Sequence, residues 1–100
     1  MKAVLIHEIE ASNDPTELER YAKFLNEEWV PYLEKLDKTD VKYTRSVWND
    51  NSGTTFIWME FETVEGFAKV WGEMDFQRLM SHRALLVKCK VRLLRPGIRD

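Results

Sequence analysis

The sequence predicts an α+β fold in which two helices cover one face of a four-stranded antiparallel sheet. Strand-like segments occur near residues 2–9, 41–48, 54–62 and 85–94. A long helical segment follows the first strand and a shorter one follows the third, so the order is strand, helix, strand, strand, helix, strand. One hundred residues suffice for one core, and we expect a single domain over residues 1–100.

The first strand and the long helix have clear local signals. Ala3–Ile6 is continuously apolar, as in a central strand buried on both faces. Asp14 and Pro15 suit the N-cap and the first helical position. Pro31 removes a hydrogen bond and clashes with the preceding turn, so we expect a kink or a break near residues 28–31. Apolar residues recur at helical spacing at Leu18, Tyr21, Ala22, Leu25, Trp29, Tyr32, Leu33 and Leu36.

A hairpin occupies the middle of the chain, with its turn at residues 49–53. Its first strand is the more polar, as an edge strand should be. Its second strand is apolar on both faces and is therefore predicted to be central. One face carries Phe56 and Trp58, and the other carries Ile57, Met59 and Phe61.

The second half is predicted to contain a helix over residues 64–71 with Thr63 as N-cap. Asp75 is expected to cap a short further turn. The last strand, 85–94, alternates apolar residues with Lys88, Lys90 and Arg92. We interpret these bases as charges that protect an edge strand, or that meet acids across a dimer, rather than as a binding stripe.

This order of elements, with the first and third strands central, is the ferredoxin-like arrangement. Both helices then lie on one face, and the other face exposes Val4, Ile6, Phe56 and Trp58. An apolar patch of this kind marks an interface. We therefore expect a homodimer whose two sheets pack face to face or close into a barrel.

The run from Phe56 to Phe67, with Trp71 and the pair Asp75-Phe76 after it, resembles the dimeric α/β-barrel superfamily. That superfamily includes the antibiotic-biosynthesis monooxygenase, NIPSNAP-like and EthD-like groups. The resemblance covers the whole chain in element order and about residues 56–80 in detail. It implies the fold more specifically than any activity, because the superfamily holds oxygenases, haem-degrading enzymes, isomerases and proteins without assigned activity.

The haem-degrading branch implies three pocket residues: an Asn on the first strand, a Trp on a later helix and a His beyond it. His7 stands where the Asn is expected, and Trp71 fits the Trp position. His82 lies two residues late, which turns it by about 200° on a helix and argues against haem ligation. His82 is kept as a candidate ligand-binding residue. Trp71 also fits ordinary core packing, and His7 also fits a satisfied strand histidine.

We predict a cavity between helices and sheet beside the kink at Pro31. Its predicted lining is Trp29, Tyr32, Phe61, Trp71 and His7. His7 is the candidate catalytic base, because an unperturbed imidazole titrates near neutrality. Tyr43 and Arg45 share a strand face and could hold a carboxylate or phenolate, or could face solvent.

Several site classes lack their sequence signals. We find no phosphate-binding glycine loop, metal-ligand cluster or nucleophile motif, so we expect no cofactor and no metal. The net charge of −2, with acids on the aromatic strand, argues against nucleic-acid binding. Neither a signal peptide nor a membrane span is indicated, and we expect a cytoplasmic protein without a membrane partner.

Two functional interpretations stay open. In the first, the chain is a homodimeric small-molecule-binding protein that acts as a cofactor-independent monooxygenase or isomerase on an aromatic or apolar substrate. In the second, it is a non-catalytic ligand-binding or assembly module of the same fold. The sequence names no substrate.

Overall fold

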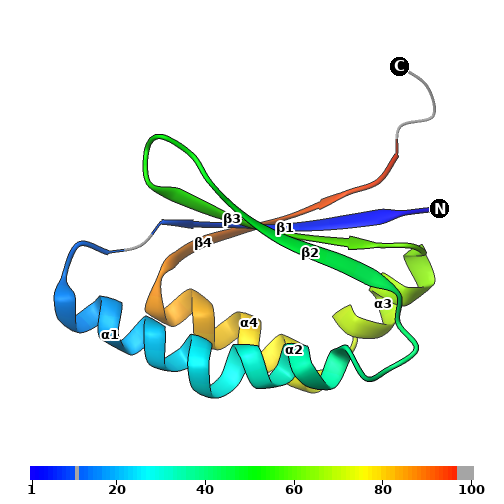
Figure 1. Cartoon of the computed structure of the whole chain (residues 1–100), viewed down its shortest axis with the longest axis horizontal. Helices are drawn as coiled ribbons and strands as arrows, with labels where there is room; N and C mark the ends of the chain where they lie inside the picture. The colour runs from blue at the N-terminus through cyan, green and yellow to red at the C-terminus, as the bar shows by residue number, and fades with distance from the viewer. Residues whose placement is uncertain (11, 97–100) are drawn as a thin grey trace.

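The computed structural model describes residues 1–10 and 12–96, which form a sheet layer and a helix layer (Figure 1). The sheet order is β2-β3-β1-β4 and every neighbouring pair is antiparallel. The first and third strands are therefore central, as predicted. The strands are β1 (Ala3–Glu10), β2 (Tyr43–Asn49), β3 (Thr54–Phe61) and β4 (Lys88–Leu94).

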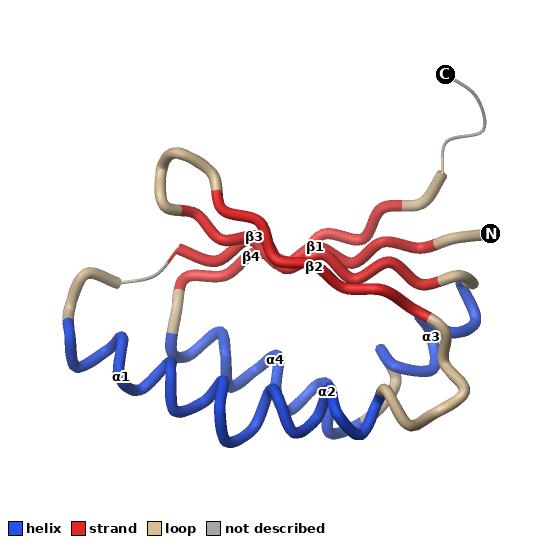
Figure 2. The backbone as a smooth tube through the Cα atoms, in the orientation of Figure 1, coloured by secondary structure: helices blue, strands red, loops and turns tan. Residues whose placement is uncertain are grey.

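The helices all cover the same face of the sheet (Figure 2). They are α1 (Pro15–Phe24), the π-helix η1 (Leu25–Trp29), α2 (Val30–Leu36), α3 (Val64–Trp71) and α4 (Met74–Leu86). With the strand order, this arrangement confirms the ferredoxin-like βαββαβ fold. No helix within the described residues is long and apolar enough to cross a membrane.

Two predicted helix starts are confirmed by their hydrogen bonds. The Asp14 carboxylate accepts from the Thr16 N–H at 2.8 Å, and Thr63 Oγ1 accepts from the Gly66 N–H at 2.9 Å. The predicted cap at Asp75 is wrong. Glu73 occupies the N-cap position of α4 without a side-chain capping bond, and Asp75 lies in the first turn.

The irregularity predicted near residues 28–31 is a wide turn and not a break. In η1 the Val30 N–H bonds to the Leu25 carbonyl, five residues back, and α2 continues directly with Pro31 in its first turn. A proline fits there because the wide turn relieves the clash of its ring with the preceding carbonyls.

The wide turn changes which side of α1 faces the sheet. Phe24 is buried whereas Leu18 and Ala22, which the predicted stripe includes, are exposed. In a regular helix the side chains of Phe24 and Leu36 would point about 120° apart around the helix axis. Because the wide turn holds about one extra residue, this angle falls to about 20°. The predicted stripe is therefore fully buried only from the end of the wide turn, at Trp29, Tyr32, Leu33 and Leu36, while Tyr21 and Leu25 pack against the core partly buried and Leu18 and Ala22 do not belong to it.

The last helix is longer than predicted. α4 has 13 residues and ends at Leu86, so the segment from Leu85 that was predicted to begin the last strand is still helical. Strand β4 begins at Lys88. The alternation predicted for β4 is confirmed, because Cys89, Val91 and Leu93 pair with helix-side residues of β1.

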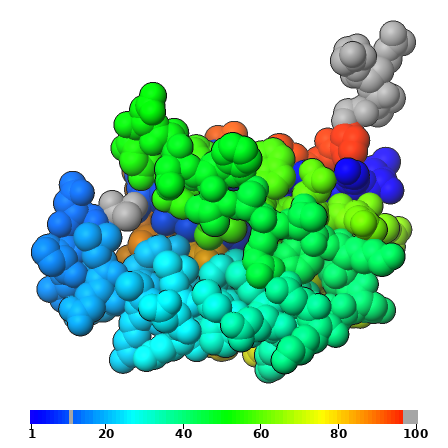
Figure 3. Space-filling model, viewed as in Figure 1, coloured from blue at the N-terminus to red at the C-terminus, as the bar shows by residue number. Residues whose placement is uncertain are grey.

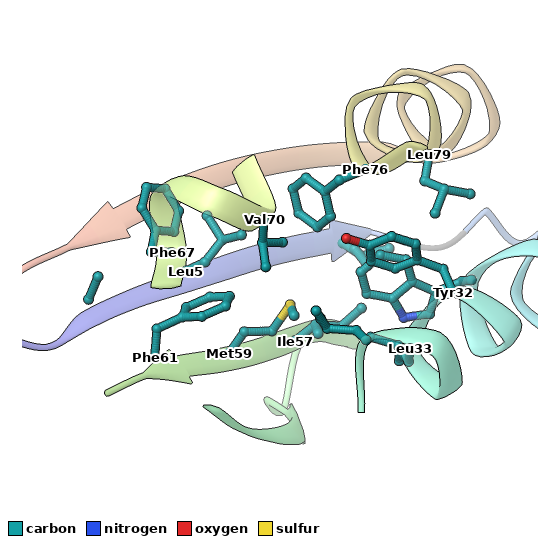
Figure 4. Close-up of a cluster of buried hydrophobic side chains, with 14 of the residues drawn as sticks. Leu5, Tyr32, Leu33, Ile57, Met59, Phe61, Phe67, Val70, Phe76 and Leu79 are labelled. Atoms are coloured by element: carbon teal, nitrogen blue, oxygen red, sulfur yellow. The ribbon is translucent and has the colours of Figure 1, made fainter. Parts of the chain in front are cut away.

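The core lies between the sheet and the helices (Figure 4). Leu5 on β1 pairs with Met59 on β3, and Ala3 pairs with Phe61, so these side chains share the helix-covered face. The opposite, outer face carries Ile6, Phe56 and Trp58, as predicted. The helices contribute Phe24, Trp29, Tyr32, Leu33, Leu36, Phe67, Val70, Phe76 and Leu79 to the core.

Candidate functional site

A pocket of about 660 Å³ opens between η1 and the edge of the sheet formed by β2 and β3. Figure 3 shows this hollow between the blue-to-cyan helical segment and the green hairpin. Its wall is mostly apolar, with a few polar groups at the rim, which is the usual composition of small-molecule sites. The lining residues are Ile9, Tyr21, Leu25, Asn26, Trp29, Val30, Leu33, Arg45, Ser46, Val47, Thr55 and Ile57.

Behind the inner wall of this pocket lies a buried pair, His7 on β1 and Arg83 on α4. Both side chains are fully buried, and the Arg83 guanidinium lies 2.7 Å from His7 Nδ1. A guanidinium has only donors, so His7 Nδ1 is the acceptor and the imidazole proton is assigned to Nε2. The geometry thus fixes the neutral imidazole in one tautomer.

The electrostatics agree with this assignment. Burial, together with the smaller effect of the neighbouring Arg83 charge, lowers the pKa of His7 to about 3. Burial also raises the pKa of the Tyr21 phenol and of the Cys89 thiol, while Arg83 opposes both rises. Arg83 is therefore the positive centre of a buried cluster of otherwise neutral groups.

Trp29 connects the pocket with this pair. Its indole lies 4.2 Å from the Arg83 guanidinium carbon and 6.0 Å from the His7 ring. The contact with Arg83 allows a cation–π attraction, and the Phe24 ring, 5.6 Å from the same guanidinium carbon, makes a second one. Trp29 and Tyr21 both line the pocket and lie near Arg83, so these two side chains stand between the cavity and the buried cation.

Tyr43 and Arg45 do hold a carboxylate, but it belongs to Asp37 of the same chain. Arg45 donates to both Asp37 oxygens at 2.8 and 3.1 Å, and the Tyr43 hydroxyl donates at 2.6 Å. These bonds lower the pKa of Asp37. Burial, followed by the bond to Asp37, raises the pKa of Tyr43 to about 12. Arg45 lies on the pocket rim with its charge already paired.

The other predicted aromatic residues pack in a row and do not line the 660 Å³ pocket. The Tyr32 ring contacts Trp29 and Phe76, and its hydroxyl donates to Glu73 at 2.9 Å. Phe61 is fully buried beside Tyr43, at 5.6 Å between ring centres. Trp71 stacks near Phe67 and Phe76 and is 40% exposed. Of the five predicted lining residues, this pocket contains Trp29 alone, and Arg45, which was predicted separately as a ligand-binding residue, also lines it.

His82 points to a different place from His7. It lies 2.9 Å from a Glu28 carboxylate oxygen and packs edge-on against Phe24 at 5.0 Å. It is partly exposed on the outside of α4, away from the pair that its sequence neighbour Arg83 forms. Within residues 1–10 and 12–96, no group of three or more His, Cys, Asp or Glu side chains is placed to hold a metal ion.

Arg83 is the site residue that sequence reasoning missed. Its signal is weak but present: Arg83 occupies a position at helical spacing from Phe76 and Leu79, where an apolar side chain is expected. The predicted strand start at Leu85 and the predicted short turn left Arg83 between elements. A longer helix would have exposed the anomaly of a cation in the apolar stripe.

The outer face of the sheet carries a second, shallower hollow of about 390 Å³. Its apolar members are Ile6, Trp48, Phe56, Trp58 and Leu94, and Ser46 lies among them. One ion pair crosses the patch, between Arg92 Nε and a Glu8 oxygen at 3.2 Å. Lys88 similarly pairs with Glu10 at 3.3 Å, so these two bases of β4 contact acids of the neighbouring strand.

Comparisons by sequence find no match, either to a protein-family model or to a curated protein. Comparisons by structure do. Rv0793 from Mycobacterium tuberculosis superposes with a TM-score of 0.69 at 11% identity, over 100% of this chain and 99% of that one. An antibiotic biosynthesis monooxygenase superposes with a TM-score of 0.66 at 13% identity, covering 97% and 99%.

A third structure is SnoaB, a cofactor-independent oxygenase from Streptomyces nogalater. Its TM-score is 0.57 at 11% identity, and the match covers 99% of this chain and 98% of that one. Identities this low establish the architecture and leave the activity open. The chain thus has the ferredoxin-like fold that the antibiotic-biosynthesis monooxygenase and NIPSNAP structures share, as its sequence predicted.

Proposed function

We propose that this protein binds a small, largely apolar ligand, most readily an aromatic one, in the pocket beside η1. The observation that carries the proposal is an open pocket of about 660 Å³ whose wall is mostly aliphatic and aromatic. The volume lies in the range of drug-sized ligand sites. Tyr21, Asn26 and Thr55 also line the pocket and supply polar groups that can orient a bound molecule.

Catalysis is the sharper form of the proposal. Cofactor-independent oxygenation or isomerisation is supported by the shared fold with SnoaB, which is described as a cofactor-independent oxygenase. His7 is the proposed catalytic residue. Because Nδ1 accepts from Arg83 and the pKa of His7 is near 3, the geometry favours His7 as a hydrogen-bond donor through Nε2 over the predicted role as base.

The alternative is a ligand-binding module of the same fold without turnover. The low pKa of His7 favours it, because an imidazole that protonates only near pH 3 is a weak base at neutrality. Both forms share the pocket and differ only in whether the bound molecule reacts.

We further propose that residues 1–100 form one domain that dimerises through the outer face of the sheet. Ile6, Phe56 and Trp58 form an apolar patch on two central strands. Burying such side chains against a second copy stabilises a dimer by about 25 cal/mol per Å² of apolar surface. Because the Glu8–Arg92 pair is satisfied within the chain, it can remain at the rim of that interface.

Ligand binding is tested with protein labelled at isoleucine methyl groups and titrated with 1-naphthol. Ile9 and Ile57 line the pocket, whereas Ile6 lies on the outer face. Binding in the pocket is expected to shift the methyl signals of Ile9 and Ile57 and to leave Ile6 nearly unchanged. Shifts confined to Ile6 would place the ligand on the wrong face of the sheet and contradict the proposal.

Turnover is tested by oxygen uptake with 1-naphthol and 1,4-naphthohydroquinone as substrates. An oxygenase should consume O₂ faster with the protein than without it, and His7→Gln should abolish the difference. The control is His82→Gln, which removes a histidine that pairs with Glu28 and not with Arg83. Binding of naphthol without any accelerated uptake would remove the oxygenase form of the proposal.

The dimer is tested by light scattering at micromolar concentration. The parent chain is expected to have twice the mass of one chain, and Trp58→Glu is expected to be monomeric, because a carboxylate cannot be buried in an apolar interface without a partner. The matched control is Met74→Glu, since Met74 is 88% exposed on the helix side. A monomeric parent chain would remove the proposed dimer.

A further inference from the structure

Arg83 is the feature of this molecule that the packing of the chain does not satisfy. Arg45, Arg78 and Arg92 each form a salt bridge with a carboxylate. Arg83 is fully buried and forms no salt bridge among residues 1–10 and 12–96; its polar neighbours are two neutral groups, His7 at 2.7 Å and the Tyr21 hydroxyl, whose contact opposes the fall in the Arg83 pKa that burial causes. A buried cation without a counter-charge is strongly disfavoured unless something else neutralises it.

The unsatisfied atoms around Arg83 are all donors. Arg83 Nε, the second guanidinium nitrogen and His7 Nε2 are buried and have no hydrogen-bond partner within the described residues. The assigned tautomer places a proton on His7 Nε2, so each of the three atoms has an N–H to donate. Leaving such donors unpaired costs roughly the desolvation penalty of each group. The two free nitrogens of Arg83 carry the positive charge and are complementary to an anionic oxygen, whereas the N–H of His7 Nε2 lies on the side of the ring that faces away from Arg83.

The surrounding aromatic rings stabilise the charge of Arg83, but they do not accept hydrogen bonds from the N–H groups in the plane of the guanidinium. The Trp29 and Phe24 ring centres lie 4.2 and 5.6 Å from the guanidinium carbon. A ring face attracts a cation through its quadrupole, but it supplies no lone pairs to the N–H groups. The rings therefore explain how Arg83 is tolerated in the free protein and leave its donors available.

We propose that the ligand of this pocket is an organic anion, an aromatic or apolar body whose carboxylate or enolate oxygen accepts hydrogen bonds from the free N–H groups of Arg83. The inference rests on the proposed pocket and adds the charge of its ligand. Arg–carboxylate pairs are among the strongest hydrogen-bonded contacts in proteins. The same donors accommodate either oxygen group, because both present a negatively charged acceptor.

Trp29 gives the anion its route. It lines the pocket and lies against the guanidinium, as Tyr21 also does, so a ligand reaches the free Arg83 donors when these two side chains move aside. Trp29 is also the last residue of η1, and wide π-turns occur frequently at functional sites. The apolar body of the ligand then takes the space beside Ile9, Leu33 and Ile57.

The inference is tested by calorimetric titration with two probes of nearly equal shape, 1-naphthoate and neutral 1-naphthalenemethanol. Naphthoate is expected to bind at least tenfold more tightly, and Arg83→Met is expected to remove that preference while both probes still bind. Equal affinities in the parent chain would overturn the anion inference and leave the pocket proposal standing. Failure of both probes to bind would count against the pocket itself.

A second measurement needs no ligand. If Arg83 is kept for a ligand, replacing its buried charge by an apolar side chain of similar length should raise the melting temperature of Arg83→Met by several degrees. The control is Arg78→Met, which breaks a surface pair with Glu28 and is expected to change the melting temperature little. A markedly lower melting temperature, or failure of Arg83→Met to fold, would make Arg83 a structural residue and overturn the inference.

Discussion

Arg45 and Arg83 both lie on the helix side of the sheet, yet the chain treats them in opposite ways. Arg45 meets a carboxylate in a two-bond pair, with the Tyr43 hydroxyl on the same acid, and its side chain is 37% exposed. Arg83 is fully buried against a neutral imidazole and two aromatic rings. The surface cluster is complete within the chain, whereas the buried one keeps donors that have no hydrogen-bond partner among the described residues.

The largest effect on stability is expected at Trp29, whose ring lies over the buried Arg83. Trp29→Ala removes a side chain that is only 4% exposed and also removes the ring over Arg83. We expect the free energy of unfolding to fall by about 3–5 kcal/mol, as for other buried Trp or Phe truncations. Urea unfolding measures it. A loss below about 1 kcal/mol would show that Trp29 does not hold the core beneath η1.

The two clusters should also lose stability in different pH ranges. The folded pKa of His7, about 3, lies below the unfolded value near 6.5, so the unfolded chain binds more protons as the pH falls. Stability from His7 is complete above pH 6.5 and is lost from there down to about pH 3, by at most about 1.4 kcal/mol per pH unit. The lowered pKa of Asp37 acts only below about pH 4.

Urea unfolding between pH 4 and 6.5 separates the two contributions. His7→Gln should flatten the dependence of stability on pH in this interval, because the titrating group is gone. His82→Gln should keep the slope of the parent chain. An unchanged slope in His7→Gln would assign the effect to another group and contradict the buried neutral imidazole.

The smallest effect is expected at the surface cluster. A double-mutant cycle of Asp37→Asn and Arg45→Met is expected to give a coupling energy of at most about 1 kcal/mol, because exposed ion pairs are screened by water and salt. Raising the salt concentration should reduce it further. A coupling of several kcal/mol would mean that this pair is more than a surface contact, and the contrast with Arg83 would weaken.

The fold was predictable because its signals are spread over many residues. The apolar run Ala3–Ile6, the alternation of β3 and the caps at Asp14 and Thr63 all agree on one element order. One misplaced boundary, at Leu85, left that order unchanged. Agreement among independent local preferences is what lets a sequence specify its fold.

The site was less predictable because it depends on single residues, on how deeply their side chains are buried and on contacts between residues far apart in the sequence. The chemistry of Tyr43 and Arg45 was anticipated, but their partner Asp37 lies in the segment before β2, where no periodic pattern marks it. The burial of His7 follows from its central strand and is the main cause of its low pKa, whereas its tautomer and the rest of the pKa shift depend on Arg83, 76 residues away in sequence. No local pattern encodes that contact.

The π-helix makes this segment sensitive to its length. Deleting one codon, that of the exposed residue Asn26, would let a regular α-helix run from Pro15 to Leu36. In this shorter helix the side chains of α1 would still face the same way relative to α2 as they do now. The wide turn would be lost, however, and with it the part of the pocket wall that η1 supplies. Such a deletion is expected to preserve cooperative thermal unfolding while reducing naphthol binding. Non-cooperative unfolding would show that the extra residue is needed for folding itself. One extra residue in a single helical turn thus makes the helix irregular at the place where the pocket lies.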